Sequence, residues 1–226
     1  MVKNKSSSNA YRRLRTNIEY NSKYPNVNSV CLTSANEGSG TTTIACNLAT
    51  TFLANHSKVL LIDCNINKPT INKYFSIDNA LGLSDMLLNQ DYSNYYKYCT
   101  NFKDDHSNNL LYVMGTGRKV KNTLDLLSSR YFNEFMDEMR KQFDFILIDC
   151  PSLEDSNDVI PVGHIVDGTI LVVSLPETEK NNAKKTLQQL NRNGVNVIGT
   201  VLNKGNPQLD RVDLKLASKI VGLKTL

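Results

Sequence analysis

The chain has 226 residues, of which 40% are hydrophobic and 21% are charged, and its formal net charge is +4 at pH 7. These values are typical of one globular α/β domain and argue against a disordered chain, a collagen-like repeat or two complete domains. The small positive charge is too weak to indicate binding to nucleic acid.

The cysteines and the N-terminal residues indicate the cellular compartment of the protein. Five cysteines are scattered without a CxxC pair, which indicates reduced thiols in a reducing compartment. No stretch approaches the roughly 18 uninterrupted apolar residues of a membrane-spanning helix. The polar, serine-rich start predicts a flexible N-terminus over residues 1–8, followed by one domain over residues 9–226. We therefore expect a cytoplasmic protein.

The first predicted element is an amphipathic helix near the N-terminus. Tyr11, Leu14 and Ile18 form a narrow apolar face at helical spacing. Arg12 and Arg15 are three residues apart and share another face of the same helix.

Strands and helices alternate along the rest of the chain. Short runs that are apolar nearly throughout predict strands buried on both faces, at residues 29–33, 58–62, 110–113, 143–148, 169–174 and 197–202. Stripes of apolar residues between them predict helices, with members at 44, 48 and 52, at 132, 135, 136 and 139, and at 183, 187 and 190. The alternation predicts an α/β fold with a doubly wound, mostly parallel sheet and helices on both faces.

Two segments stand apart from this alternation. The polar segment Asp91–Ser107 carries Tyr92, Tyr95, Tyr96 and Tyr98, and is predicted to be an excursion from the sheet. At the end of the chain, apolar residues at helical spacing predict a packed helix, with members at 212, 216, 220 and 223.

The stretch from Val30 to Ala49 predicts a strand, a glycine-containing turn and a helix. Gly38 and Gly40 stand where glycines allow backbone N–H groups to wrap a phosphate at a helix N-terminus. Thr42 would offer a hydroxyl to Mg²⁺. Position 41, which is lysine in the Walker pattern, is threonine, so the pattern alone is equally compatible with a plain turn.

Two of the predicted strands end in a carboxylate, Asp63 and Asp149. A carboxylate just beyond a buried strand commonly holds Mg²⁺ or its water in a phosphate site. A single example is often only the cap of the next helix. Two examples together with the glycine turn, in this order along the chain, favour a phosphate-binding site.

With these motifs the chain resembles the bacterial tyrosine kinases of the CpsD/CapB type (BY-kinases), in the MinD/ParA-like branch of P-loop proteins. The resemblance runs from about Asn9 to Lys204 and is carried by the order and spacing of short motifs. These are residues 10–17 (Ala-Tyr-Arg-Arg-Leu-Arg-Thr-Asn), Thr33-Ser34, 47–49 (Asn-Leu-Ala), 68–70 (Lys-Pro-Thr), 82–87, 126–129, 148–151 (Ile-Asp-Cys-Pro), Asp167-Gly168 and 201–203 (Val-Leu-Asn).

The resemblance implies ATP and Mg²⁺ as cofactors and assigns roles by position. Asp63 would touch the metal and help the attacking tyrosine hydroxyl, with Thr42 and Asp149 as further metal ligands. Asn203 would lie near the adenine base. The phosphate loop would consist of Gly38, Ser39, Gly40, Thr41, Thr42 and Thr43.

The resemblance also implies a partner and a place of action. Such kinases work with a transmembrane adaptor for polysaccharide chain length in capsule or exopolysaccharide synthesis. We therefore expect this chain at the inner face of the cell membrane, held there by the adaptor. The family's Glu-x-x-Arg-x-x-Arg oligomerisation motif retains Arg12 and Arg15 but has Asn9 in place of glutamate, so the arginines either join subunits or form a solvated basic face.

Other departures fall on the chemistry. Thr41 replaces the P-loop lysine, Asn65 stands where a second Walker A′ aspartate is expected, and Asn67 stands where an arginine is expected. The tyrosine cluster of the family's tail is missing, since the last tyrosine is Tyr131. Phosphoryl transfer depends on positioning and charge neutralisation, and losing one preorganised electrostatic group typically costs ~10²–10³ in rate.

We therefore expect a degenerate BY-kinase-like protein, a pseudokinase that serves as a regulatory or docking component of polysaccharide synthesis. One alternative is an active autokinase that uses an atypical loop, favoured by the surviving glycines and carboxylates. A weaker alternative is a positioning ATPase of the MinD/ParA type. The tyrosines of residues 92–98 are either a relocated phosphorylation target or an interaction and packing surface, and the second is favoured because tyrosine suits half-buried sites.

Overall fold

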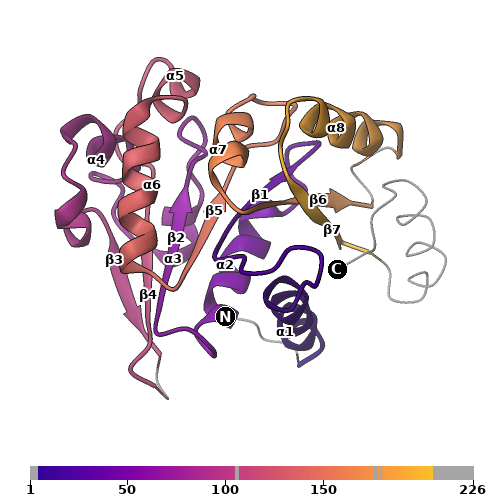
Figure 1. Ribbon diagram of the computed structural model, residues 1–226, viewed down its shortest axis with the longest axis horizontal. Helices are drawn as coiled ribbons and strands as arrows, with labels where there is room; N and C mark the ends of the chain where they lie inside the picture. Colours follow the sequence, from indigo (N-terminus) through magenta and orange to yellow (C-terminus); the bar gives the residue numbers. More distant parts are fainter. Residues whose placement is uncertain (1–4, 105–106, 176–177, 179, 206–226) are drawn as a thin grey trace.

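The computed structural model describes residues 5–104, 107–175, 178 and 180–205 of the chain. Its centre is a seven-stranded sheet with the order β3-β4-β2-β5-β1-β6-β7 (Figure 1). Neighbouring strands run parallel except at one edge, where β3 is antiparallel to β4. The strands are β1 (Ser29–Ser34), β2 (Lys58–Asp63), β3 (Thr100–Lys103), β4 (Leu110–Met114), β5 (Phe145–Asp149), β6 (Gly168–Ser174) and β7 (Val197–Asn203).

Helices cover both faces of the sheet. One face is covered by α1 (Lys5–Glu19), α2 (Thr41–Phe52) and α3 (Ile71–Phe75). The other is covered by α4 (Leu83–Asn89), the 3₁₀ helix η1 (Tyr92–Lys97), α5 (Thr123–Leu127), α6 (Arg130–Gln142), α7 (Val159–Ile165) and α8 (Lys180–Arg192). The predicted doubly wound, mostly parallel α/β fold is thereby confirmed.

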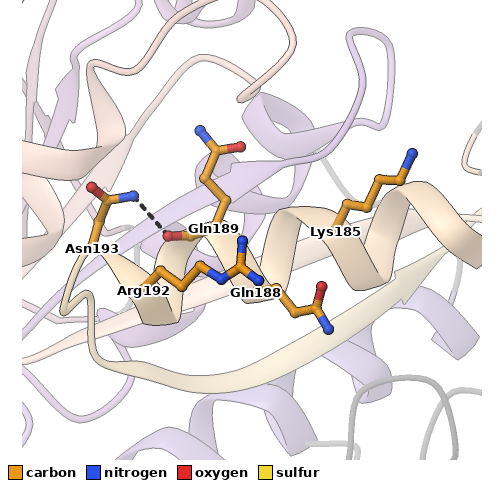
Figure 2. A pocket seen from close by; sticks show the side chains of 5 residues that line it. All are labelled: Lys185, Gln188, Gln189, Arg192 and Asn193. Atoms are coloured by element: carbon orange, nitrogen blue, oxygen red, sulfur yellow. Dashed lines mark hydrogen bonds between the residues drawn. The ribbon is translucent and has the colours of Figure 1, made fainter.

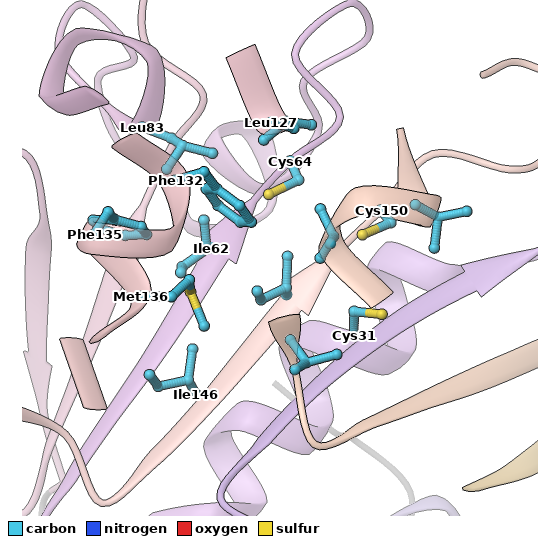
Figure 3. Packing of buried hydrophobic residues seen from close by; sticks show 14 of the residues in the cluster. Cys31, Ile62, Cys64, Leu83, Leu127, Phe132, Phe135, Met136, Ile146 and Cys150 are labelled. Carbon is cyan, nitrogen blue, oxygen red and sulfur yellow. The ribbon is translucent and has the colours of Figure 1, made fainter. Parts of the chain in front are cut away.

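Apolar residues follow one another without interruption in these strands because each such strand contributes to two cores. In β5, Phe145 and Leu147 belong to the core under α1 and α2, whereas Ile146 and Ile148 belong to the core under α6. This split follows the two-residue period of a strand. Figure 3 shows the second core, in which Phe132, Phe135 and Met136 of α6 face the sheet together with buried cysteines.

The structure corrects two expectations. The segment from Asp91 to Ser107 is not wholly an excursion, because β3 lies within it and pairs with β4 at the sheet edge. The fifth strand begins at Phe145, two residues later than predicted. The predicted C-terminal helix lies outside the described residues.

The N-terminal helix begins before the predicted domain. α1 starts at Lys5, inside the segment that was predicted to be a flexible N-terminus. The division into residues 1–8 and 9–226 stays a prediction. None of the helices in the described part of the chain is long and apolar enough to cross a membrane.

Candidate functional site

The turn between β1 and α2 has the backbone of a phosphate loop. Gly38 and Gly40 have φ angles of 77° and 84°, a left-handed conformation that glycine adopts without steric cost. A Cβ atom on Gly40 would also lie 2.3 Å from Nδ2 of Asn203, whereas one on Gly38 would meet open space. The loop is thus closed against β7 at Gly40 and open at Gly38.

Side chains inside the loop hold its shape. Ser39 is buried, and its hydroxyl donates to the carbonyl of Asn36 at 2.8 Å. Thr41, the first residue of α2, is also buried, while Thr43 is exposed. The loop therefore keeps its fold without a lysine at position 41.

The two predicted carboxylates lie side by side at the carboxyl edge of the sheet. Asp63 and Asp149 are directly paired in the register of β2 and β5. Oδ1 of Asp63 accepts the backbone N–H of Asn65 at 2.9 Å. Its Oδ2 accepts the N–H groups of Thr70 and Ile71, each at 3.1 Å. The start of α3 therefore fixes the Asp63 carboxylate.

Asp149 reaches the phosphate loop through Thr42. The Thr42 hydroxyl donates to Oδ2 of Asp149 at 2.5 Å and lies 2.9 Å from the Thr70 hydroxyl. Oδ1 of Asp149 is buried without a hydrogen-bond partner among the described residues. An unpartnered buried carboxylate oxygen is costly, so this atom calls for a cation or a proton.

Burial shapes the protonation of this pair. It raises the pKa of Asp63 to about 6, against the N–H groups of Ile71, Asn65 and Thr70, which lower it. Burial and then the charge of Asp63 raise the pKa of Asp149 well above its usual range, against the Thr42 hydrogen bond. Two facing carboxylates disfavour joint ionisation, and a nearby divalent cation would reverse that preference.

The donor set fits Mg²⁺. Thr42, Asp63 and Asp149 offer hard oxygen atoms, and Mg²⁺ typically takes one or two protein oxygens and completes its shell with water and phosphate. No group of three or more His, Cys, Asp or Glu residues in the described part of the chain could hold a metal by itself. The site thus suits a metal that arrives with a phosphate ligand, where it would neutralise phosphate charge.

Comparisons with known proteins agree with this geometry. The family model described as an AAA domain matches residues 27–210. The tyrosine-protein kinase YwqD of Bacillus subtilis is 34% identical over 197 residues, which cover 87% of this chain and 81% of the relative. The tyrosine-protein kinase CpsD of Streptococcus pneumoniae serotype 4 is 32% identical over 88% of this chain and 85% of the relative. The chain belongs to the BY-kinase family.

Solved structures share the fold of this BY-kinase chain. The chimerical protein CapA2B2 has a TM-score of 0.79 at 28% identity, covering 90% of this chain and 86% of that one. The septum site-determining protein MinD of Pyrococcus horikoshii, solved with Mg-ADP, has a TM-score of 0.63 at 18% identity, covering 87% of this chain and 78% of that one. The likeness to MinD supports the fold alone.

Most of the polar residues at this site were predictable from the sequence, and others were not. Asn203 does contact the loop, since its Nδ2 donates to the carbonyl of Ser39 at 2.8 Å, and its role toward adenine stays a prediction. Thr70 was not predicted to take part in the site, although its hydroxyl lies 2.9 Å from that of Thr42. Lys204 was not predicted to contact the loop either, although its Nζ donates to the carbonyl of Gly38 at 2.9 Å. No sequence pattern marks that contact.

Lys68 joins the loop to the segment after β5. Its Nζ lies 2.7 Å from a carboxylate oxygen of Glu37 and 2.8 Å from one of Asp155. The side chain is half exposed, so these ion pairs add little stability. They do fix where the positive charge lies, between two carboxylates.

Arg12 and Arg15, predicted either to join subunits or to form a solvated basic face, differ in environment. Nη1 of Arg15 donates to the carbonyl of Thr51 at 2.8 Å, and its Nε lies 3.5 Å from Glu19. Arg12 is exposed. Arg15 is therefore engaged within its own chain, and only Arg12 is presented to solvent.

The tyrosine-rich segment packs against α6 and β4. Tyr92 contacts Phe135 edge to face, and Tyr95 contacts Tyr112 and Phe143 in the same way. Tyr98 is buried. These three contacts confirm the packing interpretation, and of the four tyrosines only Tyr96 is largely exposed, at 58%.

A separate hollow lies on α8 and shares no residue with the phosphate loop. It has a volume of about 430 Å³ and is lined by Lys185, Gln188, Gln189, Arg192 and Asn193 (Figure 2). The Asn193 side chain donates to the carbonyl of Gln189 at 2.8 Å. The hollow therefore belongs to the helix surface, apart from the carboxylates.

Proposed function

We propose that this BY-kinase chain binds MgATP and serves as a regulatory or docking component of capsule or exopolysaccharide synthesis, with its own phosphoryl transfer largely lost. The observation that carries the proposal is the Thr42–Asp149–Asp63 cluster, with one unpartnered carboxylate oxygen, beside a loop that lacks the family lysine. The cluster supports binding of a metal with a nucleotide. The missing lysine argues against fast transfer.

The second Walker A′ position strengthens this proposal. Asn65 replaces the expected aspartate, and its backbone N–H rather than a carboxylate contacts Asp63. A metal site with one carboxylate fewer can still bind Mg²⁺, because phosphate and water complete the coordination shell. It positions the metal less strictly in the transition state, where catalysis depends on preorganised charge.

Calorimetric titration with MgATP tests nucleotide binding. We expect wild-type protein to bind, and Asp149→Asn to bind at least about tenfold more weakly, because the variant removes a charge-assisted contact of the order of 1.5–3 kcal/mol. The surface variant Asp137→Asn is the matched control, since this side chain is 73% exposed. Removing Mg²⁺ should lower the affinity of the wild-type protein for ATP toward that of Asp149→Asn. A wild type that fails to bind, or an unaffected Asp149→Asn, would contradict the proposal.

The proposed partner is a transmembrane adaptor for polysaccharide chain length, as the family resemblance implies, which would hold the chain at the inner face of the membrane. Co-purification with an adaptor encoded nearby, from detergent-solubilised membranes, tests the docking role. We expect the adaptor to retain this chain in the presence of MgATP. If the two proteins, both folded, never associate with or without nucleotide, the docking role is wrong.

A second candidate function is an active autokinase. The raised pKa of Asp63, about 6, favours it, because a carboxylate poised near neutral pH suits a general base. The two candidates differ in one outcome, which is phosphate transferred to the chain's own tyrosines.

A further inference from the structure

Thr70 lies at the start of α3 and contacts two of the three predicted metal ligands. Its backbone N–H donates to Oδ2 of Asp63 at 3.1 Å, and its hydroxyl lies 2.9 Å from the Thr42 hydroxyl. Asp63 is the last residue of β2, and Thr42 lies in the first turn of α2. One residue outside the predicted site thus joins two ligands that come from different elements.

The Thr70 hydroxyl is not used to cap its own helix. Thr70 is the N-cap residue of α3, a position that favours threonine because the side-chain oxygen accepts an N–H group of the first turn. Within the described α3 this side chain makes no such bond, and the N–H of Ile71 is bound by Asp63 instead. The hydroxyl contacts Thr42, 28 positions earlier in the chain. It is therefore directed toward the site and away from its own helix.

The direction of this hydrogen bond follows from the protons available. The Thr42 hydroxyl has one proton, which it donates to Oδ2 of Asp149 at 2.5 Å. In the contact between the two threonines, the Thr70 hydroxyl is therefore the donor and the Thr42 oxygen is the acceptor. A hydroxyl oxygen has two lone pairs. Because Thr70 occupies one of them, a single lone pair of Thr42 is left for a cation.

We propose that Thr70 is a positioning residue for Mg²⁺, because its hydroxyl fixes the orientation of the Thr42 hydroxyl that would bind the metal of MgADP or MgATP. This role rests on the proposed function, since it requires Mg²⁺ to enter with a nucleotide. Hydrogen-bond partners that orient a metal ligand raise metal affinity, because the ligand loses less conformational freedom when the metal binds. Such support matters more in a site where Asn65 stands in place of an aspartate.

The Mg²⁺ dependence of ADP binding tests this role. Thr70→Val removes the hydroxyl but keeps the size of the side chain and the backbone N–H. At a fixed ADP concentration it should raise the Mg²⁺ concentration for half-maximal binding by about 3- to 10-fold, the range of one hydrogen bond. Thr70→Ser keeps the donor and should behave like wild type. Thr50→Val is the matched control and should also behave like wild type, because this exposed threonine of α2 bonds the Cys46 carbonyl of its own helix.

Combination with Thr42→Val separates positioning from a merely structural role. If Thr70 acts through the Thr42 hydroxyl, its own hydroxyl has no effect once that group is gone, so the double variant should bind MgADP like Thr42→Val. Losses that add in full would overturn the proposal.

The Thr70 variants also supply two contradicting outcomes of their own. An unchanged Mg²⁺ dependence in Thr70→Val would overturn the proposal, as would an equal loss in Thr70→Ser, which keeps the donor. Each of these results leaves nucleotide binding by the wild-type protein intact. A wild type without affinity for MgADP would instead refute the proposed function together with the role of Thr70.

Discussion

Thr41 and Asn65 replace a cation and an anion of the family pattern within one site. These two replacements cancel each other in formal charge, and we expect them to weaken the alignment of metal and phosphate. The remaining carboxylates are buried and come from paired positions on neighbouring strands. The raised pKa of each follows from that burial and, for Asp149, from the charge of Asp63.

The first prediction concerns the pH dependence of stability without metal. Burial raises the pKa of Asp63 from 3.8 to about 6, so the folded protein binds this proton more tightly than the unfolded chain does. The free energy of unfolding should therefore rise as pH falls from 7 to 5. This added stability is lost as pH rises through 6. Urea unfolding in the presence of a chelator measures it.

Asp63→Asn is the matched variant for this measurement. Its amide does not titrate, so its free energy of unfolding should change less between pH 7 and 5 than that of wild type. Any fixed cost of the substitution cancels in this comparison. Identical pH dependence in the two proteins would show that Asp63 titrates at its ordinary pKa.

At the scale of elements, α1 is attached to α2 through Arg15 as well as through apolar contacts. Arg15→Ala should lower the free energy of unfolding by about 1–2 kcal/mol, because the Thr51 carbonyl and Glu19 both lose a partner. Arg12→Ala should change it by less than about 0.5 kcal/mol, since Arg12 is exposed. Urea unfolding measures both.

Oligomeric state provides the opposing outcome for these arginines. If Arg15→Ala dissociated an oligomer while leaving the stability of the subunit unchanged, Arg15 would serve the interface of the family motif instead of the contact with α2. Light scattering on the same samples reports that result.

The segment η1 gives a second prediction at this scale. Tyr95→Ala should lower the free energy of unfolding by about 2–3 kcal/mol, because it removes a half-buried ring from Tyr112 and Phe143. Tyr96→Ala, at an exposed ring, is the control and should be nearly neutral. Equal effects at both positions would mean that η1 is not anchored by Tyr95.

The same elements show what a sequence can predict. Strands such as β5 are recognisable because both of their faces are buried, so apolar residues follow one another without interruption. β3 escaped prediction because its four residues, Thr-Asn-Phe-Lys, lie mostly exposed at the sheet edge and are held by pairing with β4. Its position depends on a neighbour and leaves no apolar pattern.

The residues of the candidate site also differ in whether the sequence could predict them. Asp63 and Asp149 were predictable as a pair, since parallel strands end at one edge of the sheet. The contact between Lys204 and Gly38 was not, because it joins residues 166 positions apart through the packing of β7 beside β6. The order of strands had to be known before these residues could be brought together.

At the scale of the molecule, the sheet separates two apolar cores and carries the site at the carboxyl ends of its central strands. The described residues thus have the fold of a BY-kinase around a glycine turn with threonine at position 41. On this scaffold, we propose, MgATP still binds but phosphate is transferred poorly.

The most direct test is the intact mass of the wild-type protein after incubation with saturating MgATP, with the Bacillus subtilis relative as positive control. We predict an unchanged mass for this chain under conditions in which the relative gains phosphoryl groups. A mass increase of one or more phosphoryl groups, lost on treatment with a tyrosine phosphatase, would contradict the claim and establish an active autokinase.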